Sequence, residues 1–306
     1  MRVLFVSSGN NKFGVSPIIK NQGISLEKEG VELEYFTIKG KGVKGYFRAI
    51  FELKRHLKAN SYDIIHAHYW LSGITAALAG AKPLVVSLMG DDVKANGFFR
   101  FIVSIFYYLF WDKTILKSQD MCKSFGKKGV AVIPNGVDMQ KFRPIDKRTA
   151  LEVTGWDKNK RHILFTANPK RRVKNFPLAK EAFDLLDDKD LELHALKDIP
   201  NEKVPFFYNA ADVVLMTSLW EGSPNAIKEA MACNIPIVST NVGDVEDVIA
   251  STKGCFIAKA DAKDIAQKIK EALKYQRTTG REDIKHLSAQ NIAKKIIALY
   301  KSLKEE

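Results

Sequence analysis

The chain has 306 residues, of which 46% are hydrophobic and 27% are charged, and its formal net charge is +13. These proportions are typical of a globular protein with a substantial core, and they exclude a disordered or fibrous chain. Most of the net positive charge lies in residues 1–158, which hold 24 Lys and Arg against 14 Asp and Glu. This excess indicates an anionic partner such as a membrane surface, a lipid phosphate or nucleic acid, unless it serves only solubility.

Short β-branched runs alternate with helical segments along the whole chain, which predicts an α/β fold with parallel sheets covered by helices. Strands of the first half are predicted at residues 2–6, 31–38, 63–66, 84–87, 113–116 and 130–133. Its helices are predicted at residues 16–29, 46–58 and 72–78. After a linker at about 138–160, strands follow at 162–165, 191–196, 213–216, 235–238 and 254–257. Residues 283–304 have apolar side chains at helical spacing and predict one amphipathic helix.

The most informative stretch is the turn that follows the predicted strand at 213–216. Ser223 suits the N-cap of the next helix and Pro224 suits its first turn. The mouth of such a helix attracts phosphate through its unpaired N–H groups and its dipole. Glu221 and Glu229 flank this mouth, and carboxylates accept hydrogen bonds from neighbouring hydroxyls. Phosphate between hydroxyl-rich groups describes a nucleotide sugar, so we expect one as the ligand.

Two motifs carry a resemblance to a known family. Glu221 and Glu229 are separated by seven residues, with Gly222 after the first and an apolar strand beyond, and residues 133–138 read Ile-Pro-Asn-Gly-Val-Asp. Together they resemble retaining glycosyltransferases of family 4, over the whole chain. The resemblance implies the GT-B fold, in which two Rossmann-like domains face each other across a cleft. The domains would be residues 1–158, on the acceptor side, and 159–282, which bind the nucleotide sugar, with a helix at 283–306 crossing back to the first.

The resemblance also implies roles for individual residues. Glu229 would bind the ribose hydroxyls of the donor nucleotide, and Glu221 the hydroxyls of the transferred sugar. The backbone around the turn would meet the distal phosphate or the sugar; its residues are Gly222, Ser223, Pro224 and Asn225.

A basic loop follows the first strand of the second half, with four cations in the five positions 170–174. Such a loop can neutralise a diphosphate leaving group without a metal ion. The family usually has Gly-Arg here, where this chain has Ala167-Asn168, but Lys174 matches the family lysine. The arginine role falls to Arg171 or Arg172, and we expect Arg171. The other interpretation is an exposed basic loop without a role.

Further candidates follow strands of the first half. Gly9 and Gly14 belong to a loop that, by resemblance, closes over the donor phosphates, although a structural turn explains them equally. Of His66 and His68, which are read as alternating along a strand end, we expect only His68 to face the cleft. Met89 stands where the family has a histidine that contacts the donor, so the resemblance does not imply the usual sugar contact here. Asp91-Asp92 lacks the spacing of a D-x-D metal motif, and we expect no metal.

Residues 39–58 combine a predicted aromatic stripe with lysines and arginines, which suits the interface of an anionic membrane, although the stripe can instead pack on the sheet. No apolar run approaches the ~20 residues that span a bilayer, and the first apolar strand is too short for a signal peptide. Three widely spaced cysteines (Cys122, Cys233 and Cys255) indicate free thiols. We therefore expect a cytoplasmic protein with peripheral contact to the inner face of the membrane.

The sequence thus predicts a glycosyltransferase that moves a hexose-type sugar from a nucleoside diphosphate sugar to an acceptor hydroxyl. Resemblance implies retention of configuration, no metal and no other cofactor. We expect the acceptor to be a glycan or lipid-linked glycan of the cell envelope, and we expect no nucleic acid partner. Two alternatives remain: a sugar-nucleotide epimerase of the same fold, and a non-catalytic basic module that binds membranes or nucleic acid.

Overall fold

The computed structural model describes all residues except 11–13, 41, 91–96, 250 and 306. The chain forms two compact units. Unit 1 comprises residues 1–136 and 289–306, and unit 2 comprises residues 137–288. Residues 137–158, which the sequence analysis assigns to the first domain, therefore lie in unit 2.

Unit 1 is a parallel sheet of six strands in the order β2-β1-β3-β4-β5-β6. The central strands are buried almost completely, as expected for a sheet that is covered on both faces. In chain order its elements are β1 (Arg2–Ser8), α1 (Pro17–Glu27), β2 (Glu32–Ile38), α2 (Gly42–Ala59), β3 (Ile64–His68), α3 (Trp70–Leu78), β4 (Leu84–Ser87), α4 (Gly97–Leu109), β5 (Lys113–Leu116), α5 (Gln119–Phe125), β6 (Ala131–Val132) and α13 (Ala289–Glu305).

Unit 2 is a second parallel sheet, with five strands in the order β11-β10-β9-β7-β8. Among the residues that the structure describes, α8 alone lies between β8 and β9 in sequence, and no further strand intervenes. Its elements are α6 (Lys147–Thr154), β7 (Arg161–Phe165), η1 (Arg172–Lys174), α7 (Phe176–Asp184), β8 (Leu191–Ala195), α8 (Val204–Ala210), β9 (Val213–Met216), α9 (Asn225–Ala232), β10 (Ile237–Thr240), α10 (Val245–Ile249), β11 (Cys255–Ala258), α11 (Ala262–Ala272), α12 (Gly280–Asp283) and η2 (Lys285–Leu287).

The C-terminal helix returns to the first unit, as predicted, but the prediction of one continuous helix over 283–304 is wrong. Its first residues belong to α12 and η2, and Ser288 is extended, with ψ 147°. Ser288 pairs there with Val137, whose N–H donates to Leu287 O at 3.0 Å. Helix α13 then packs on α1 and buries Ile292, Ala293, Ile296 and Tyr300 in unit 1.

None of the helices in the described parts of the chain is both long and apolar enough to cross a membrane.

Candidate functional site

The predicted site of unit 2 lies at the carboxyl ends of β7 and β9. The chain runs from β7 outwards to β8 on one side and through β9 to β10 and β11 on the other. Open α/β sheets bind ligands at this kind of switch in strand order. The basic loop follows β7 and the Glu221 turn follows β9, so the topology brings both predicted segments to one place.

The turn between β9 and α9 differs from the prediction at its cap. Pro224 is the N-cap and makes no side-chain cap, and the helix begins at Asn225. Ser223 was predicted as the cap, but its hydroxyl instead donates to Asp244 Oδ2 at 2.6 Å. Gly222 is buried, and a Cβ at Gly243 would lie 2.7 Å from Gly222 O. The turn is therefore held against the 240s loop, and the N–H groups of α9 have no side-chain cap.

A buried charge pair, Lys228 and Asp244, contacts this turn through Ser223. Lys228 is fully buried, and its Nζ donates to Ser223 Oγ and lies 3.1 Å from Asp244 Oδ2. Burial lowers the pKa of Lys228, while the Asp244 carboxylate opposes that shift. Lys228 and Asp244 were not predicted from the sequence. A lysine among the apolar residues of a predicted helix could have indicated a buried charge, but nothing local identifies Asp244 as its partner.

The basic loop meets the turn through Lys174. Lys174 Nζ forms an ion pair with Glu221 Oε1, which also accepts a hydrogen bond from Ser218 Oγ at 2.8 Å. The side chains of Lys174 and Glu221 are only 11% and 17% exposed. Thr217 fixes the loop, because its hydroxyl lies 3.1 Å from Lys174 O and 2.9 Å from Asn175 O. The structure thus joins two segments that are 47 positions apart in the sequence.

The two candidate arginines are placed differently from Lys174. Arg171 and Arg172 are both exposed. The backbone of Arg171 accepts a hydrogen bond from Lys174 N at 2.9 Å, so Arg171 lies within the same turn. The choice between the two arginines stays a prediction.

Glu229 lies on α9 and is half-buried. Tyr208 of α8, which is fully buried, donates its hydroxyl to Glu229 Oε2 at 2.9 Å. Burial raises the pKa of Glu229, and the Tyr208 hydrogen bond together with Lys141 and Lys228 partly opposes this rise. The bond to Oε2 leaves Oε1 for a ligand. Tyr208 was missed because nothing in its local sequence marks it as a partner of Glu229.

The glycine loop of unit 1 is tied to the end of β2. Gly9 N donates to Ile38 O at 2.9 Å, and a Cβ at Gly9 would lie 2.9 Å from Thr37 Cβ. Asn10 adds two hydrogen bonds to the backbone of Gly40, at 2.8 and 2.9 Å. Packing therefore explains the glycine at position 9. Gly14 has φ +71° and open space around its Cα, and Asp91-Asp92 lies outside the described residues.

The expected orientation of the two histidines on β3 is wrong. His66 and His68 do not point to opposite sides: their rings stack at 4.3 Å, because residues two apart in a strand share one face. His66 is a hydrogen-bonded structural histidine, with Nδ1 2.5 Å from Tyr300 Oη and Nε2 2.8 Å from Ser87 Oγ. His68 is 1% exposed and packs on Phe5 at 4.4 Å, and neither ring nitrogen has a hydrogen-bond partner among the described residues. Its assignment to the site stays a prediction.

These two histidines make the stability of unit 1 depend on pH. Burial above all holds the pKa of both well below the usual value; His68 and then Lys117 add to the shift of His66, and Lys117 adds to that of His68. Below pH ~6.5 the unfolded histidines take up protons that the folded ones do not, so the free energy of unfolding falls as the pH falls, by about 1.4 kcal/mol per pH unit for each histidine. We expect His68→Leu to remove part of this slope in denaturant titrations between pH 7.5 and 5. His286→Asn, at an exposed position of unit 2, is the control. An unchanged slope in His68→Leu would contradict the lowered pKa of His68 in the folded protein.

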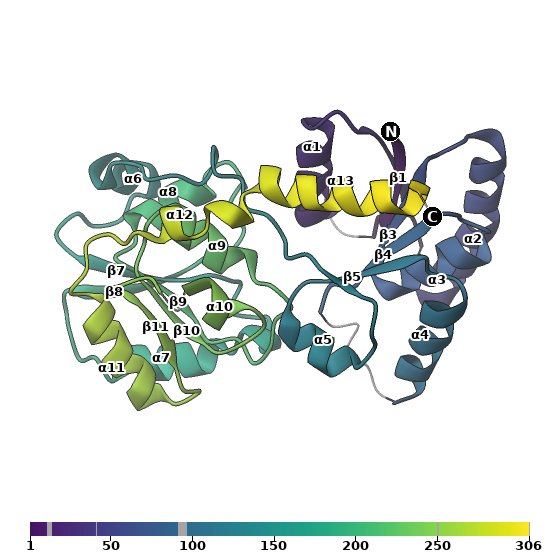
Figure 1. The fold of residues 1–306 in the computed structure, drawn as a ribbon. Coiled ribbons are helices and arrows are strands. Elements are labelled where there is room, and N and C mark those ends of the chain that lie inside the picture. The colour runs from purple at the N-terminus through teal and green to yellow at the C-terminus, as the bar shows by residue number, and fades with distance from the viewer. Residues whose placement is uncertain (11–13, 41, 91–96, 250, 306) are drawn as a thin grey trace. The chain divides into compact units, whose positions relative to one another are not determined.

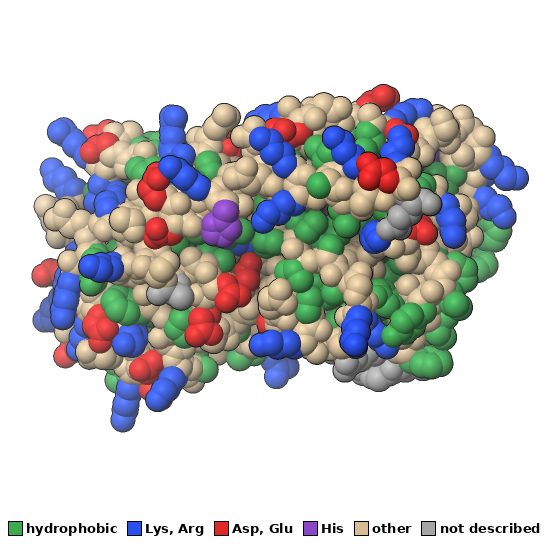
Figure 2. All heavy atoms as spheres, viewed as in Figure 1, with side chains coloured by type: hydrophobic (Ala, Val, Ile, Leu, Met, Phe, Trp, Pro, Cys, Tyr) green, Lys and Arg blue, Asp and Glu red, His purple; other side chains and the backbone are tan. Residues whose placement is uncertain are grey.

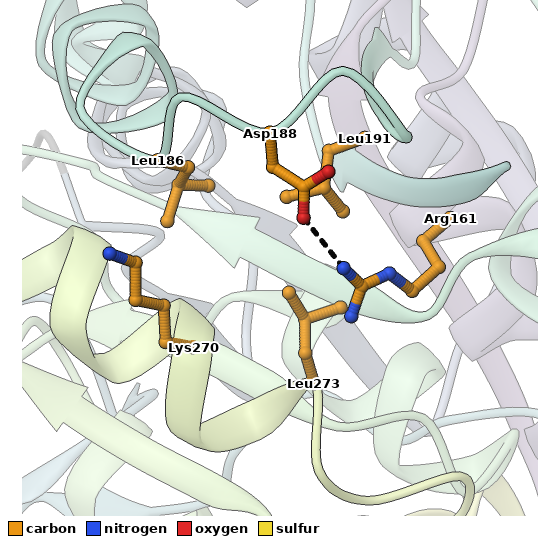
Figure 3. A pocket seen from close by; sticks show the side chains of 6 residues that line it. All are labelled: Arg161, Leu186, Asp188, Leu191, Lys270 and Leu273. Atoms are coloured by element: carbon orange, nitrogen blue, oxygen red, sulfur yellow. Dashed lines mark hydrogen bonds and ion pairs between the residues drawn. The ribbon is translucent and has the colours of Figure 1, made fainter.

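A small hollow in unit 2 is not part of the predicted site. It has a volume of about 110 Å³ and is lined by Arg161, Leu186, Asp188, Leu191, Lys270 and Leu273 (Figure 3). Arg161 and Asp188 close it with an ion pair of 2.7 Å. Ligand pockets measure roughly 300–1,000 Å³, so this hollow is too small for a nucleotide sugar.

Two family models match the chain. The model described as Glycosyltransferase Family 4 matches residues 20–141, and the model described as Glycosyl transferases group 1 matches residues 188–294. The chain belongs to glycosyltransferase family 4. The second match contains Glu221, Glu229 and the turn between them, whereas Lys174 and the basic loop lie just before it.

One sequence relative illustrates the distance at which this family 4 glycosyltransferase matches curated proteins. An Escherichia coli enzyme named UDP-Gal:alpha-D-GlcNAc-diphosphoundecaprenol alpha-1,3-galactosyltransferase is 25% identical over 241 residues, which are 64% of this chain and 62% of the relative. The chain thus spans less than two thirds of the length of that relative.

Solved structures resemble the family 4 chain over nearly its whole length. Sucrose-phosphate synthase from Thermosynechococcus elongatus superposes with a TM-score of 0.82 at 16% identity and covers 99% of both chains. Anabaena HepE in complex with UDP and glucose gives 0.75 at 16% identity and covers 99% of this chain and 100% of that one. These likenesses show the fold: GT-B, with two Rossmann-like domains, as predicted.

Proposed function

We propose that this protein transfers a hexose-type sugar from a nucleoside diphosphate sugar to an acceptor hydroxyl, with retention of configuration and without a metal ion. The observation that carries the proposal is the contact between Lys174 and Glu221 at the switch in strand order. It brings a cation of the basic loop to the turn whose second carboxylate, Glu229, lies on the following helix. A cation can pair with a diphosphate, and carboxylates accept hydrogen bonds from the sugar hydroxyls on either side of it.

Each group of the site has a task in the proposed reaction. Glu229 accepts hydrogen bonds from the ribose hydroxyls through Oε1, and Glu221 accepts them from the transferred sugar. The backbone of the turn from Gly222 to Asn225 meets the distal phosphate, where α9 has no side-chain cap.

Lys174 gains a second partner in the proposed reaction. Without donor it neutralises Glu221, and with donor it also faces the diphosphate, whose negative charge grows as the glycosidic bond breaks. Arg171 adds a second cation from the same loop. Catalysis then comes from stabilising the leaving group and from positioning, without a strong general base.

We infer that the acceptor is a glycan or lipid-linked glycan of the cell envelope. The E. coli relative has a diphosphoundecaprenol acceptor in its name. Residues 1–158, which carry +10 of the net charge of +13, suit an anionic acceptor of that kind.

Ligand binding tests the proposal directly. UDP-, GDP- and ADP-sugars are compared in thermal unfolding, and we expect one nucleotide series to raise the Tm because it binds only the folded protein. The stabilising donor is then incubated with acceptor, and the anomeric configuration of the product is read by NMR. Stabilisation by none of the donors, or an epimer formed from donor alone, would contradict the proposal.

Peripheral membrane contact is the second part of the proposal, and α2 supports it. Its predicted stripe is divided: Tyr46, Ile50 and Leu57 pack against the core of unit 1, whereas Phe47 and Phe51 are 62% and 55% exposed. Exposed cations of α2 accompany them, namely Lys44, Arg48, Lys54, Arg55 and Lys58. Hydrophobic side chains also gather on the surface of unit 1 where α2 and α4 lie (Figure 2).

We expect the protein to co-sediment with liposomes that contain anionic lipid, and less so at high salt, because salt screens the cations. Phe47→Ser/Phe51→Ser should reduce binding at both salt concentrations because it removes the inserted rings. Leu185→Ser, at an exposed apolar position of unit 2, is the matched control. No binding at low salt would exclude the membrane contact.

A further inference from the structure

Unit 2 carries a second cluster of polar side chains at the end of its sheet opposite to the donor site. His162 is the second residue of β7, and Glu192 and His194 lie on the neighbouring edge strand β8 (Figure 1). His162 pairs in register with Glu192, and His194 lies two residues further along β8. Residues two apart share a face of the sheet, so both β8 side chains meet His162. Arg161 and Leu191 directly precede His162 and Glu192 in their strands, and they line the hollow of Figure 3 instead.

The three side chains converge on one point. His162 Nδ1 is 3.1 Å from His194 Nε2, Glu192 Oε2 is 3.7 Å from His162 Nδ1, and Glu192 Oε2 is 3.4 Å from His194 Nε2. The corners of a triangle with these sides lie about 2.0 Å from a common centre, which is the length of Zn–N and Zn–O bonds. One ion can therefore contact all three atoms without moving a strand.

Neighbouring groups orient these side chains toward the common centre. His162 Nε2 lies 2.9 Å from Asp157 O and donates to it, so the proton is on Nε2 and Nδ1 keeps its lone pair. Lys160 Nζ binds Glu192 Oε1 at 3.0 Å, which leaves Oε2 facing the imidazoles. Trp156 stacks on His194, with ring centroids 3.8 Å apart and planes at 12°. His194 Nε2 is then the donor to His162 Nδ1, so an ion binds His194 in its other tautomer, with the proton on Nδ1.

The ligand types are also those of a metal site. The cluster offers two imidazoles and one carboxylate, which is the ligand set that zinc prefers among oxygen and nitrogen donors.

We propose that His162, Glu192 and His194 bind a divalent transition-metal ion of the zinc class. His162 is fully buried, whereas the side chains of Glu192 and His194 are 32% and 22% exposed, so the fourth position opens to solvent and takes water. The site lies at the amino end of β7 and the reaction site at its carboxyl end, so the ion serves structure. It joins the edge strand β8 to β7, and it is separate from the sugar transfer, for which no metal is expected.

Zinc titration of the full chain tests this proposal. The protein is treated with chelator, kept reduced, and titrated with zinc sulfate by calorimetry at pH 7.5, with thermal unfolding followed in parallel. We expect one equivalent to bind and the Tm to rise with zinc concentration. His194→Gln, at a partly exposed ligand, should weaken zinc binding at least about tenfold and abolish the rise in Tm.

The matched control is His286→Gln, which removes an exposed histidine of the same unit and should leave the titration unchanged. Glu192→Gln provides a second ligand variant if His194→Gln folds poorly; it should show the same weakening. The proposal is overturned if the wild type binds no stoichiometric zinc, or if both ligand variants bind it as the wild type does. In that case the histidines form only a hydrogen-bonded pair beneath Trp156. Because neither readout requires glycosyl transfer, the result is independent of the proposed function.

Discussion

Replacing Lys174 by methionine is expected to lower kcat about 10²–10³-fold, the usual loss when one group that stabilises transition-state charge is removed. The donor KM should change much less, because the charge on the diphosphate grows mainly as the glycosidic bond breaks. Methionine keeps the length of the side chain, and steady-state kinetics with the stabilising donor measure both constants.

Lys170→Met is the matched control for this variant. Lys170 belongs to the same basic loop but is exposed, so its loss changes the net charge equally without touching Glu221. Removing Lys174 also leaves Glu221 without its cation, and a partly buried unpaired charge costs stability. Lys174→Met/Glu221→Gln separates the two effects, since it should recover the Tm but not kcat. An unchanged kcat in Lys174→Met, or an equal loss in Lys170→Met, would contradict the proposed role.

The alternation of strands and helices was predictable because buried parallel strands have a strong apolar pattern. β4, β5 and β9 begin and end where the sequence predicts. Helix α2 begins at Gly42, four residues before the predicted position 46. The prediction differs because glycine-rich basic residues usually indicate a loop. The predicted continuous helix at the C-terminus fails at Ser288, where pairing with Val137 overrides helical periodicity.

The position of the candidate site was predictable from topology, but its internal contacts were not. Polar residues after β7 and β9 meet because parallel strands end at one edge of the sheet. The partners of Lys228 and Glu229 come from the 240s loop and from α8, and no local pattern connects them. Ser223 shows the same limit: it suits an N-cap by sequence, but Asp244 offers its hydroxyl a charged acceptor and draws it away from the helix.

Replacing Glu229 by glutamine is expected to raise the donor KM about 10- to 100-fold, because hydrogen bonds to a charged group contribute roughly 1.5–3 kcal/mol and a tenfold change in affinity corresponds to about 1.4 kcal/mol. Glutamine keeps the size of the side chain and can still accept the bond from Tyr208, so the Tm should change little. Glu229→Ala should act at least as strongly, because it also removes that acceptor. Tyr208→Phe removes the donor to Oε2 but leaves the carboxylate, and it should raise KM less than Glu229→Gln.

The pH dependence of donor binding provides a second test of Glu229. Burial raises its pKa, so Glu229 takes up a proton at a higher pH than an exposed glutamate does. The protonated acid accepts hydroxyl donors less well than the carboxylate. KM should therefore rise on acidification already above the usual glutamate range, and this rise should be absent in Glu229→Gln. If kcat/KM of Glu229→Gln equals that of the wild type across this range, the ribose of the donor binds elsewhere.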